Sequence, residues 1–402
     1  MNIIEVGSVT SPSGFRAAGV QCGIKAKTDK RDLALIYSEV PASAAAVYTK
    51  NRVKAAPLRI TKRHLGNDRA QAVVANSGNA NACTGETGLQ DALRTAEWVS
   101  ETLKIATEDV LVASTGVIGV PLPMDRIELG VREAALKLRE DGGDEAAEAI
   151  MTTDLVPKKI AVEVGLSTGK VTIGGITKGS GMIAPDMATM LAFLTTDASI
   201  EPHVLAGLLR NSVERSFNMI TVDGDMSTND TVIVLANGAA DGPTLVGDNA
   251  DTELFHQGLD FVAKELAQRI VRDGEGATKF VIVRVRGARA FHDAKTVAMS
   301  VANSNLVKTA VFGEDPNWGR ILAAVGYSGV EVDERKIQVS VGGVPIFHDG
   351  LGAAFDRDQV RGTLQGREVL IEVDLKDGSA CAEVYTCDLS YDYVRINAEY
   401  TT

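Results

Sequence analysis

Residues 178–198 read Lys-Gly-Ser-Gly-Met-Ile-Ala-Pro-Asp-Met-Ala-Thr-Met-Leu-Ala-Phe-Leu-Thr-Thr-Asp-Ala and join a flexible segment to an apolar one. Gly179 and Gly181 permit positive φ, and Pro185 disfavours helix in the residue before it. After Thr189 the sequence turns apolar for a run short enough to be one buried strand. The pattern therefore predicts that the hydroxyl residue Thr189 lies at the point where a flexible loop enters the core.

The composition is that of a large, acidic, globular chain. By length alone, 402 residues predict two or three domains. No apolar run approaches the ~20 residues of a membrane span, and the first residues lack the regions of a signal peptide, so we expect a cytoplasmic protein. The net charge of -12 disfavours nucleic acid or an anionic membrane as the main partner. The four cysteines are scattered, and we expect reduced thiols.

Hydrophobic periodicity predicts strands and helices that alternate along the chain. The expected strands are 14–20, 33–37, 72–75, 110–113, 190–194, 232–236, 280–285, 337–341, 369–375, 382–387 and 391–396. The expected helices are 89–103, 123–138, 145–151, 202–213, 254–271, 294–306 and 317–325. Two strands are expected to end in polar, Gly-containing loops at 76–81 and 114–119. Alternation without a strict βαβ repeat favours a layered α/β or α+β fold, with sheets covered by helices.

Several familiar motifs are present only in incomplete form. The run 179–184 matches a dinucleotide fingerprint, but Pro185 follows where a helix should begin. The run 165–170 is one residue short of a phosphate loop, which favours a hairpin turn. The run 223–229 resembles a calcium loop but has Thr228 where glycine is needed, so a polar loop is expected. The five histidines lack metal-ligand spacing, and no metal site is predicted.

The chemistry of Thr189 depends on whether the chain is cut before it. An internal threonine hydroxyl is a poor nucleophile when no base is visible nearby, and such a residue is usually structural. A free N-terminal threonine carries its own base, because its α-amine has a pKa of ~7.7–8.0 and accepts the hydroxyl proton near neutral pH. The Gly- and Pro-containing run before Thr189 provides the backbone freedom that self-cleavage needs.

Further motifs follow in one order along nearly the whole chain. They begin with Gly-Phe-Arg-Ala-Ala-Gly at 14–19 and continue at 76–85, 114–119, 151–154, 273–279, 315–320 and 397–402. Together with residues 178–191 they closely resemble the signature of the ornithine acetyltransferase family, the glutamate N-acetyltransferases of cyclic arginine biosynthesis. The resemblance implies an αββα fold similar to that of N-terminal-nucleophile enzymes.

The same resemblance implies that the precursor cuts itself between Ala188 and Thr189. Residues 1–188 would form an α chain with the oxyanion hole, and residues 189–402 a β chain that begins with the nucleophile. The two chains would form one intertwined catalytic unit. In a ping-pong cycle, Thr189 would take an acetyl group from N-acetylornithine, release ornithine and pass the acetyl group to glutamate.

The resemblance also assigns roles to residues outside this stretch. Thr115 and Gly116 would stabilise the tetrahedral oxyanion. Lys178 would pair with a substrate α-carboxylate, while Glu275 or the terminal carboxylate of Thr402 would hold the ornithine ammonium. The residues implied in substrate binding are Thr152, Lys178, Thr189, Glu275, Asn397 and Thr402. Without the resemblance, these charges are also typical of solvated loops, and Thr115-Gly116 of an ordinary turn.

No metal or organic cofactor is implied, and acetyl-CoA serves some members of the family as a co-substrate. The expected assembly is an α2β2 heterotetramer, and the expected partners are N-acetylornithine and glutamate rather than nucleic acid or a membrane. An alternative is an N-terminal-nucleophile amidohydrolase or aminopeptidase on a related scaffold. A non-enzymatic small-molecule binder is a third hypothesis, supported only by the Gly-rich loops.

Overall fold

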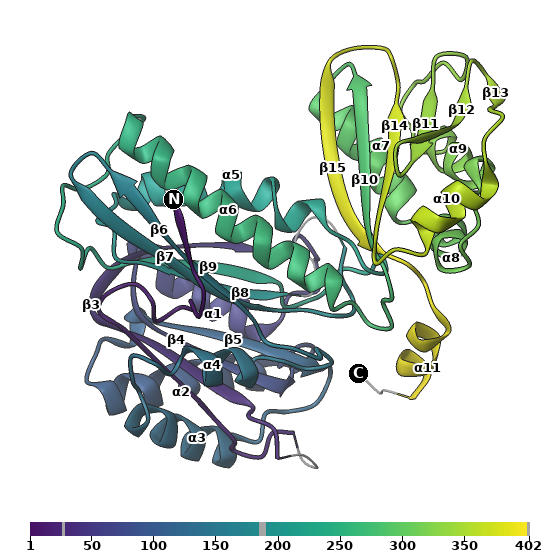
Figure 1. Cartoon of the computed structure of the whole chain (residues 1–402). Coiled ribbons are helices and arrows are strands. Elements are labelled where there is room, and N and C mark those ends of the chain that lie inside the picture. The colour runs from purple at the N-terminus through teal and green to yellow at the C-terminus, as the bar shows by residue number, and fades with distance from the viewer. Residues whose placement is uncertain (26–28, 185–189, 400–402) are drawn as a thin grey trace.

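The computed structural model describes residues 1–25, 29–184 and 190–399, which form two β-sheets and the helices that cover them (Figure 1). The larger sheet contains β1 (Asn2–Ile4), β2 (Phe15–Val20), β3 (Leu33–Tyr48), β4 (Arg69–Asn79), β5 (Val110–Val117), β6 (Lys158–Leu166), β7 (Gly169–Lys178), β8 (Leu191–Thr196) and β9 (Thr231–Ala236). Its strand order is β1-β6-β7-β8-β9-β3-β4-β5, with β2 paired to β3.

The smaller sheet lies in the C-terminal part of the chain. It contains β10 (Phe280–Ala288), β11 (Gln338–Val341), β12 (Val344–His348), β13 (Leu351–Gly352), β14 (Glu368–Asp374) and β15 (Ala380–Cys387), in the order β13-β12-β11-β14-β10-β15. The helices are α1 (Ala56–His64), α2 (Gly85–Leu103), α3 (Met124–Leu136), α4 (Gly143–Ala149), α5 (Pro202–Glu214), α6 (Ala250–Arg272), α7 (Phe291–Ala302), α8 (Asn305–Phe312), α9 (Trp318–Gly326), α10 (Arg357–Leu364) and α11 (Tyr391–Glu399). Short 3₁₀ turns span Leu65–Asn67, Thr107–Asp109 and Phe217–Met219. Among the described helices, none combines the length and the apolar character needed to span a membrane.

The long strand β3 folds the larger sheet into two facing halves. Its first part pairs with β4 through Leu33–Tyr37, and its second part pairs with β9 through Ser43–Tyr48. The pairing with β4 is irregular between Tyr37 and Ala42, where the strand changes register. Side chains from both halves pack together in one buried cluster, which includes Ile36, Val73, Leu111, Ile176, Phe193 and Ile233.

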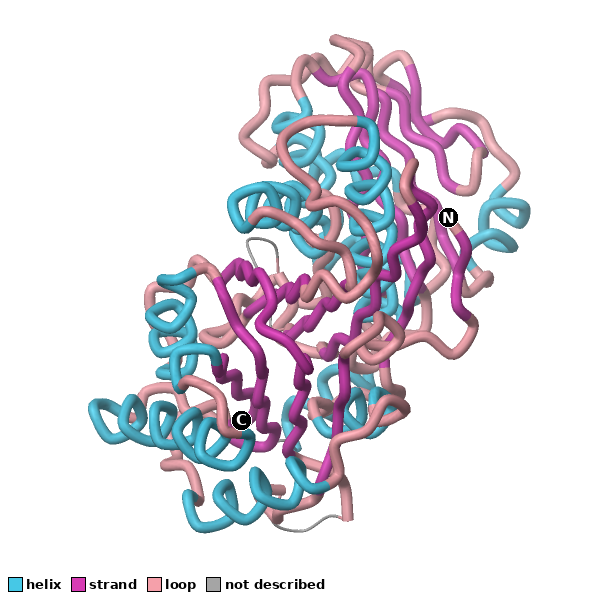
Figure 2. Tube along the Cα trace, turned by 90° about the vertical axis from the view of Figure 1, so that its left-hand side faces the viewer, coloured by secondary structure: helices cyan, strands magenta, loops and turns pink. Residues whose placement is uncertain are grey.

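Helices cover the outer face of each half (Figures 1 and 2). On β4 and β5, residues alternate between the inner cluster and an outer one, where Val74 and Val112 pack with α2 and α3. On the other half, α5 and α6 bury Leu205 and Leu259 against β6 to β9. The order of layers is therefore helix, sheet, sheet, helix, and the predicted layered α/β fold of αββα type is confirmed.

Most predicted elements are present, including the hairpin turn at 165–170, which joins β6 to β7. The polar runs 76–79 and 114–117 were expected as loops, but they continue β4 and β5 as a parallel pair with Ser77 opposite Thr115. Strand geometry is possible here because the polar side chains find partners inside the protein, including one another. Ser114 Oγ donates to Asn76 Oδ1 over 2.6 Å.

Two predictions near the C-terminus were wrong in type or extent. The expected helix 294–306 is interrupted at Asn303, and Ser304 begins the separate helix α8 by accepting a hydrogen bond from Val307 N. The aromatic and β-branched run 391–396 predicted a strand but forms α11. Tyr391 and Val394 are exposed, and no described strand pairs with this segment, so a helix satisfies its backbone locally.

Candidate active site

A polar pocket brings together all the described residues that were predicted from the sequence as site residues. Its lining includes Thr115, Gly116, Thr152, Lys178, Glu275 and Asn397, which come from β5, the loop after α4, β7, the turn after α6, and α11. Ala188, Thr189 and Thr402 lie outside the described residues. The roles assigned to all of these residues stay predictions, but the six that the structure describes share one cavity.

Thr115 and Gly116 lie near the end of β5, the last strand in the order of the larger sheet. Gly116 has a φ of 135°, which favours glycine. A Cβ atom at this position would lie only 2.3 Å from the carbonyl carbon of Gly78 on β4. The close approach of β4 and β5 therefore requires glycine at 116 and fixes the backbone of this strand end.

Lys178 and the start of β8 are neighbours in the sheet. Lys178 is the register partner of Leu191, and Thr177 Oγ1 donates to Leu191 O over 2.9 Å. Strand β7, which ends at the predicted substrate residue Lys178, is thus paired with β8, which begins shortly after Thr189. The two proposed chains, 1–188 and 189–402, would share one sheet through this pair.

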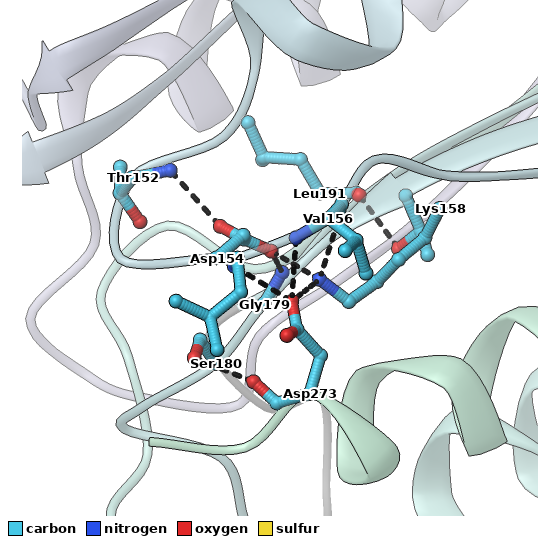
Figure 3. Close-up of polar contacts among 10 residues, drawn as sticks. Thr152, Asp154, Val156, Lys158, Gly179, Ser180, Leu191 and Asp273 are labelled. Atoms are coloured by element: carbon cyan, nitrogen blue, oxygen red, sulfur yellow. Dashed lines mark hydrogen bonds and ion pairs between the residues drawn. The ribbon is translucent and has the colours of Figure 1, made fainter. Parts of the chain in front are cut away.

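A buried ion cluster joins the segments that carry several pocket residues (Figure 3). Lys158 Nζ is 2.7 Å from Asp154 Oδ1 and 2.6 Å from Asp273 Oδ2, and all three side chains are at most 8% exposed. Asp154 also accepts hydrogen bonds from the backbone N–H groups of Thr152 (2.9 Å) and Gly179 (2.8 Å). One carboxylate therefore fixes both the Thr152 loop and the residue that follows Lys178.

Asp273 positions the other side of the pocket. Its backbone carbonyl accepts a hydrogen bond from Ser180 Oγ (2.8 Å), and Glu275 N donates to Ser180 O over 2.9 Å. A Cβ atom at Gly181 would lie 2.3 Å from Glu275 Oε2, so a side chain there would displace the Glu275 carboxylate. Asn397 Nδ2 donates to the same Glu275 oxygen over 2.8 Å, which ties α11 to the pocket.

Burial and neighbouring charges set the ionisation of this region. Burial lowers the pKa of Lys178, while the Asp154 and Glu275 carboxylates oppose this effect. For Asp154, burial alone would raise the pKa, but the Lys178 and Lys158 ammonium groups lower it well below its usual range. The Asp154 carboxylate is therefore charged at neutral pH.

The pocket itself carries groups of both signs, Lys178 and Glu275. A substrate with a carboxylate and an ammonium group would find a partner for each. Among the described residues, no group of three or more His, Cys, Asp or Glu side chains could hold a metal ion. The described lining is therefore polar and holds a basic and an acidic side chain.

The sequence reasoning missed a second segment of the pocket, residues 227–229, which comes from the run that resembled a calcium loop. This run is the expected polar loop, and its Asp223 carboxylate accepts hydrogen bonds from Met182 N (2.6 Å) and Ile183 N (2.8 Å). No spacing in the sequence places it beside Thr115, because the two segments are more than a hundred residues apart. The alternating oxygen side chains of the run were the only signal.

The layered fold holds a polar pocket lined by a basic and an acidic side chain, and similarity to known proteins identifies the class as an enzyme of arginine biosynthesis. The chain belongs to the ArgJ family, whose model matches residues 16–402. It is 50% identical over 406 residues to the arginine biosynthesis bifunctional protein ArgJ of Caldanaerobacter subterraneus subsp. tengcongensis, covering 100% of both chains. A protein of the same name from Symbiobacterium thermophilum is 52% identical over 397 residues, with 98% of this chain and 99% of that protein covered.

The solved structures include a crystal structure of arginine biosynthesis bifunctional protein ArgJ from Bacillus halodurans. It is 42% identical and has a TM-score of 0.50, and the comparison covers 51% of this chain and 97% of that chain. The resemblance drawn from the motifs is confirmed by these relatives.

Replacing Asp154 with Asn should destabilise the protein, because it leaves Lys158 with one carboxylate fewer in a buried site. We expect a loss of about 3 kcal/mol at pH 7, measured as a lower Tm. The folded-state pKa of Asp154 is depressed, so its stabilisation is present above the unfolded pKa of ~3.9 and is lost as pH falls through the folded pKa. The Tm difference from wild type should therefore shrink below pH ~4.

Asp333→Asn is the matched control, since Asp333 forms an exposed ion pair with Arg335. It should change Tm little at any pH. Equal effects of Asp154→Asn and Asp333→Asn would contradict the structural role of the buried cluster.

Proposed function

We propose that this chain is a self-processing acetyltransferase that moves an acetyl group from N-acetylornithine to glutamate in cyclic arginine biosynthesis. Its membership of the ArgJ family supports this function. The observation that carries the proposal is the single pocket in which the six described site residues meet. These residues come from segments on both sides of the proposed cut, so the complete site needs both chains.

The charges of the pocket support an amino-acid substrate. The Lys178 ammonium group binds the α-carboxylate that N-acetylornithine and glutamate share. Glu275, held in place by Asn397, binds the side-chain ammonium group of ornithine, with the terminal carboxylate of Thr402 as the alternative partner. Thr152 contributes a hydroxyl from the loop that Asp154 fixes.

The proposed cycle has two half-reactions. The α-amine of Thr189 accepts the proton of its own hydroxyl, and the oxygen attacks the acetyl carbonyl carbon. Backbone and hydroxyl donors at Thr115 and Gly116 stabilise the resulting oxyanion. The bond to the ornithine nitrogen then breaks, this nitrogen takes the proton, and an acetyl ester of Thr189 remains. The α-amine of glutamate attacks this ester in the second half-reaction and restores the hydroxyl.

Self-cleavage uses the same hydroxyl. Thr189 attacks the carbonyl carbon of Ala188, the peptide nitrogen is released as the new α-amine, and water hydrolyses the ester between the two chains. The solved Bacillus halodurans chain supports such a cut, because 97% of it corresponds to only 51% of this chain, and it is therefore about half as long. None of these steps requires a metal or an organic cofactor. The relatives are named bifunctional, which supports acetyl-CoA as a second acetyl donor to Thr189.

Thr189→Ala should give one uncut chain of 402 residues without acetyltransferase activity, because it removes the only oxygen that both reactions use. The wild type should show two fragments, of 188 and 214 residues, on a denaturing gel. Thr189→Ser is the matched control, since it keeps a hydroxyl and should still be cut. An active Thr189→Ala enzyme would contradict the proposal.

The acceptor distinguishes a transferase from an amidohydrolase with the same nucleophile. We expect steady ornithine release from N-acetylornithine only when glutamate is present, because water should attack the acetyl ester slowly. Ornithine can be measured with and without glutamate at equal enzyme concentration. A rate independent of glutamate would indicate hydrolysis and would rule out transfer as the main activity.

A further inference from the structure

We propose that Asn229 is a positioning residue that ties the strand of the oxyanion donors to the segment that directly follows the nucleophile. This inference rests on the proposed function, in which Thr115 and Gly116 stabilise the oxyanion and Thr189 attacks. Asn229 lies in the short segment before β9 and lines the pocket. Nothing in its sequence neighbourhood predicts this role.

The Asn229 side chain is buried and fully hydrogen-bonded. Its Nδ2 donates to Ala80 O over 2.6 Å and to Ser114 O over 2.8 Å. Its Oδ1 accepts a hydrogen bond from Thr228 Oγ1 over 2.6 Å. Because Ala80 O and Ser114 O are both hydrogen-bond acceptors, only the NH₂ group of the Asn229 amide fits between them. The orientation of the side chain is therefore determined by its surroundings.

The two carbonyl groups belong to residues that lie next to the oxyanion donors. Ser114 directly precedes Thr115 on β5. Ala80 N donates to Val117 O over 2.9 Å, so Ala80 lies beside the residue that follows Gly116. Asn229 thus contacts the residue before Thr115 directly, and through Ala80 it is linked to the residue after Gly116.

The residue after Asn229 contacts the segment that follows Thr189. Asp230 is fully buried, and its Oδ1 accepts a hydrogen bond from Met190 N over 3.0 Å. Thr231 N donates to Met190 O over 3.2 Å, so both backbone groups of Met190 are held. Met190 directly follows Thr189 in the sequence. The dipeptide 229–230 therefore connects the donor strand to the chain next to the nucleophile.

The proposed cut makes this connection important. Ala80 and Ser114 belong to residues 1–188, whereas Asn229 and Asp230 belong to residues 189–402. After cleavage, no covalent bond would join the donors to the nucleophile. The Asn229 amide is then one of the contacts that keep the two reacting partners of different chains in position. A displacement of about 1 Å in such a site can reduce the rate roughly 100-fold.

The chain offers a matched control at the other end of β9. Asn237 is also buried, and its Nδ2 donates to a distant backbone carbonyl, Ser13 O, over 2.9 Å. It does not line the pocket. Asn237→Ala removes the same kind of group from the other flank of β9 without touching the donors, so it reports the purely structural cost.

The test compares acetyl-transfer kinetics of the processed wild type, Asn229→Ala and Asn237→Ala. We expect kcat of Asn229→Ala to fall roughly 10- to 100-fold, because the donors lose their position. KM for N-acetylornithine should change less than about threefold, since Lys178 and Glu275 keep their own contacts. Asn237→Ala should keep the wild-type kcat, even if both variants lower Tm to a similar degree.

An Asn229→Ala enzyme with wild-type kcat, or an equal loss of kcat in Asn237→Ala, would overturn the inference. If Asn229→Ala does not fold, Asn229→Ser and Asn237→Ser replace the alanine pair. Serine keeps one donor, and only the Asn229→Ser enzyme should then have a reduced kcat. A wild-type enzyme without acetyl transfer would contradict the proposed function itself, whereas an active wild type with an equally active Asn229→Ala would contradict only the role of Asn229.

Discussion

The site depends on the ion pairs that the buried Lys158 ammonium group forms with Asp154 and Asp273. An ion of this kind is costly to remove from water unless carboxylates and hydrogen bonds surround it. Asp154 and Asp273 supply that compensation, and their remaining bonding capacity goes to backbone N–H groups of the loops that carry the predicted substrate residues. Replacing a whole buried ion cluster by well-packed apolar residues is often neutral for stability. We therefore attribute to this cluster the placement of the loops, in addition to its effect on stability.

The fold brings the segments that carry the site residues together. The bent strand β3 lets one sheet form two facing layers, and the apolar cluster between them orders the strand ends around the pocket. Gly116 then allows β4 and β5 to approach more closely than any side chain would permit, and Gly181 leaves room for the Glu275 carboxylate in its present position. Apolar packing determines how the two layers of the sheet are arranged, and the buried charges and glycines determine the local geometry of the pocket.

Periodicity predicted most strands, most helices and the layered class, because these depend on which side chains are apolar. It did not predict that β4 continues through residues 76–79. The Asn76 side chain there bonds to Ser114 on β5, and one sequence does not show this partner. It also predicted a strand at 391–396 from residue type alone, although no described strand lies there for it to pair with.

The residues of the candidate site likewise fall into those that the sequence indicated and those that only the fold revealed. The motifs indicated Thr115, Lys178 and Glu275, since these residues stand in recognisable runs. Asn229 and Lys158 were missed, because each acts through contacts with segments far away in the sequence. Asp154 and Asp273 were inside quoted motifs, but their common partner Lys158 was not visible without the fold.

The most direct test of the account is the intact mass of the wild-type protein after brief incubation with N-acetylornithine in the absence of glutamate. The account predicts a 214-residue fragment that carries one added acetyl group on its N-terminal residue, Thr189, and loses it when glutamate is added. An unmodified fragment, an acetyl group on another residue, or a chain that remains at 402 residues would contradict it.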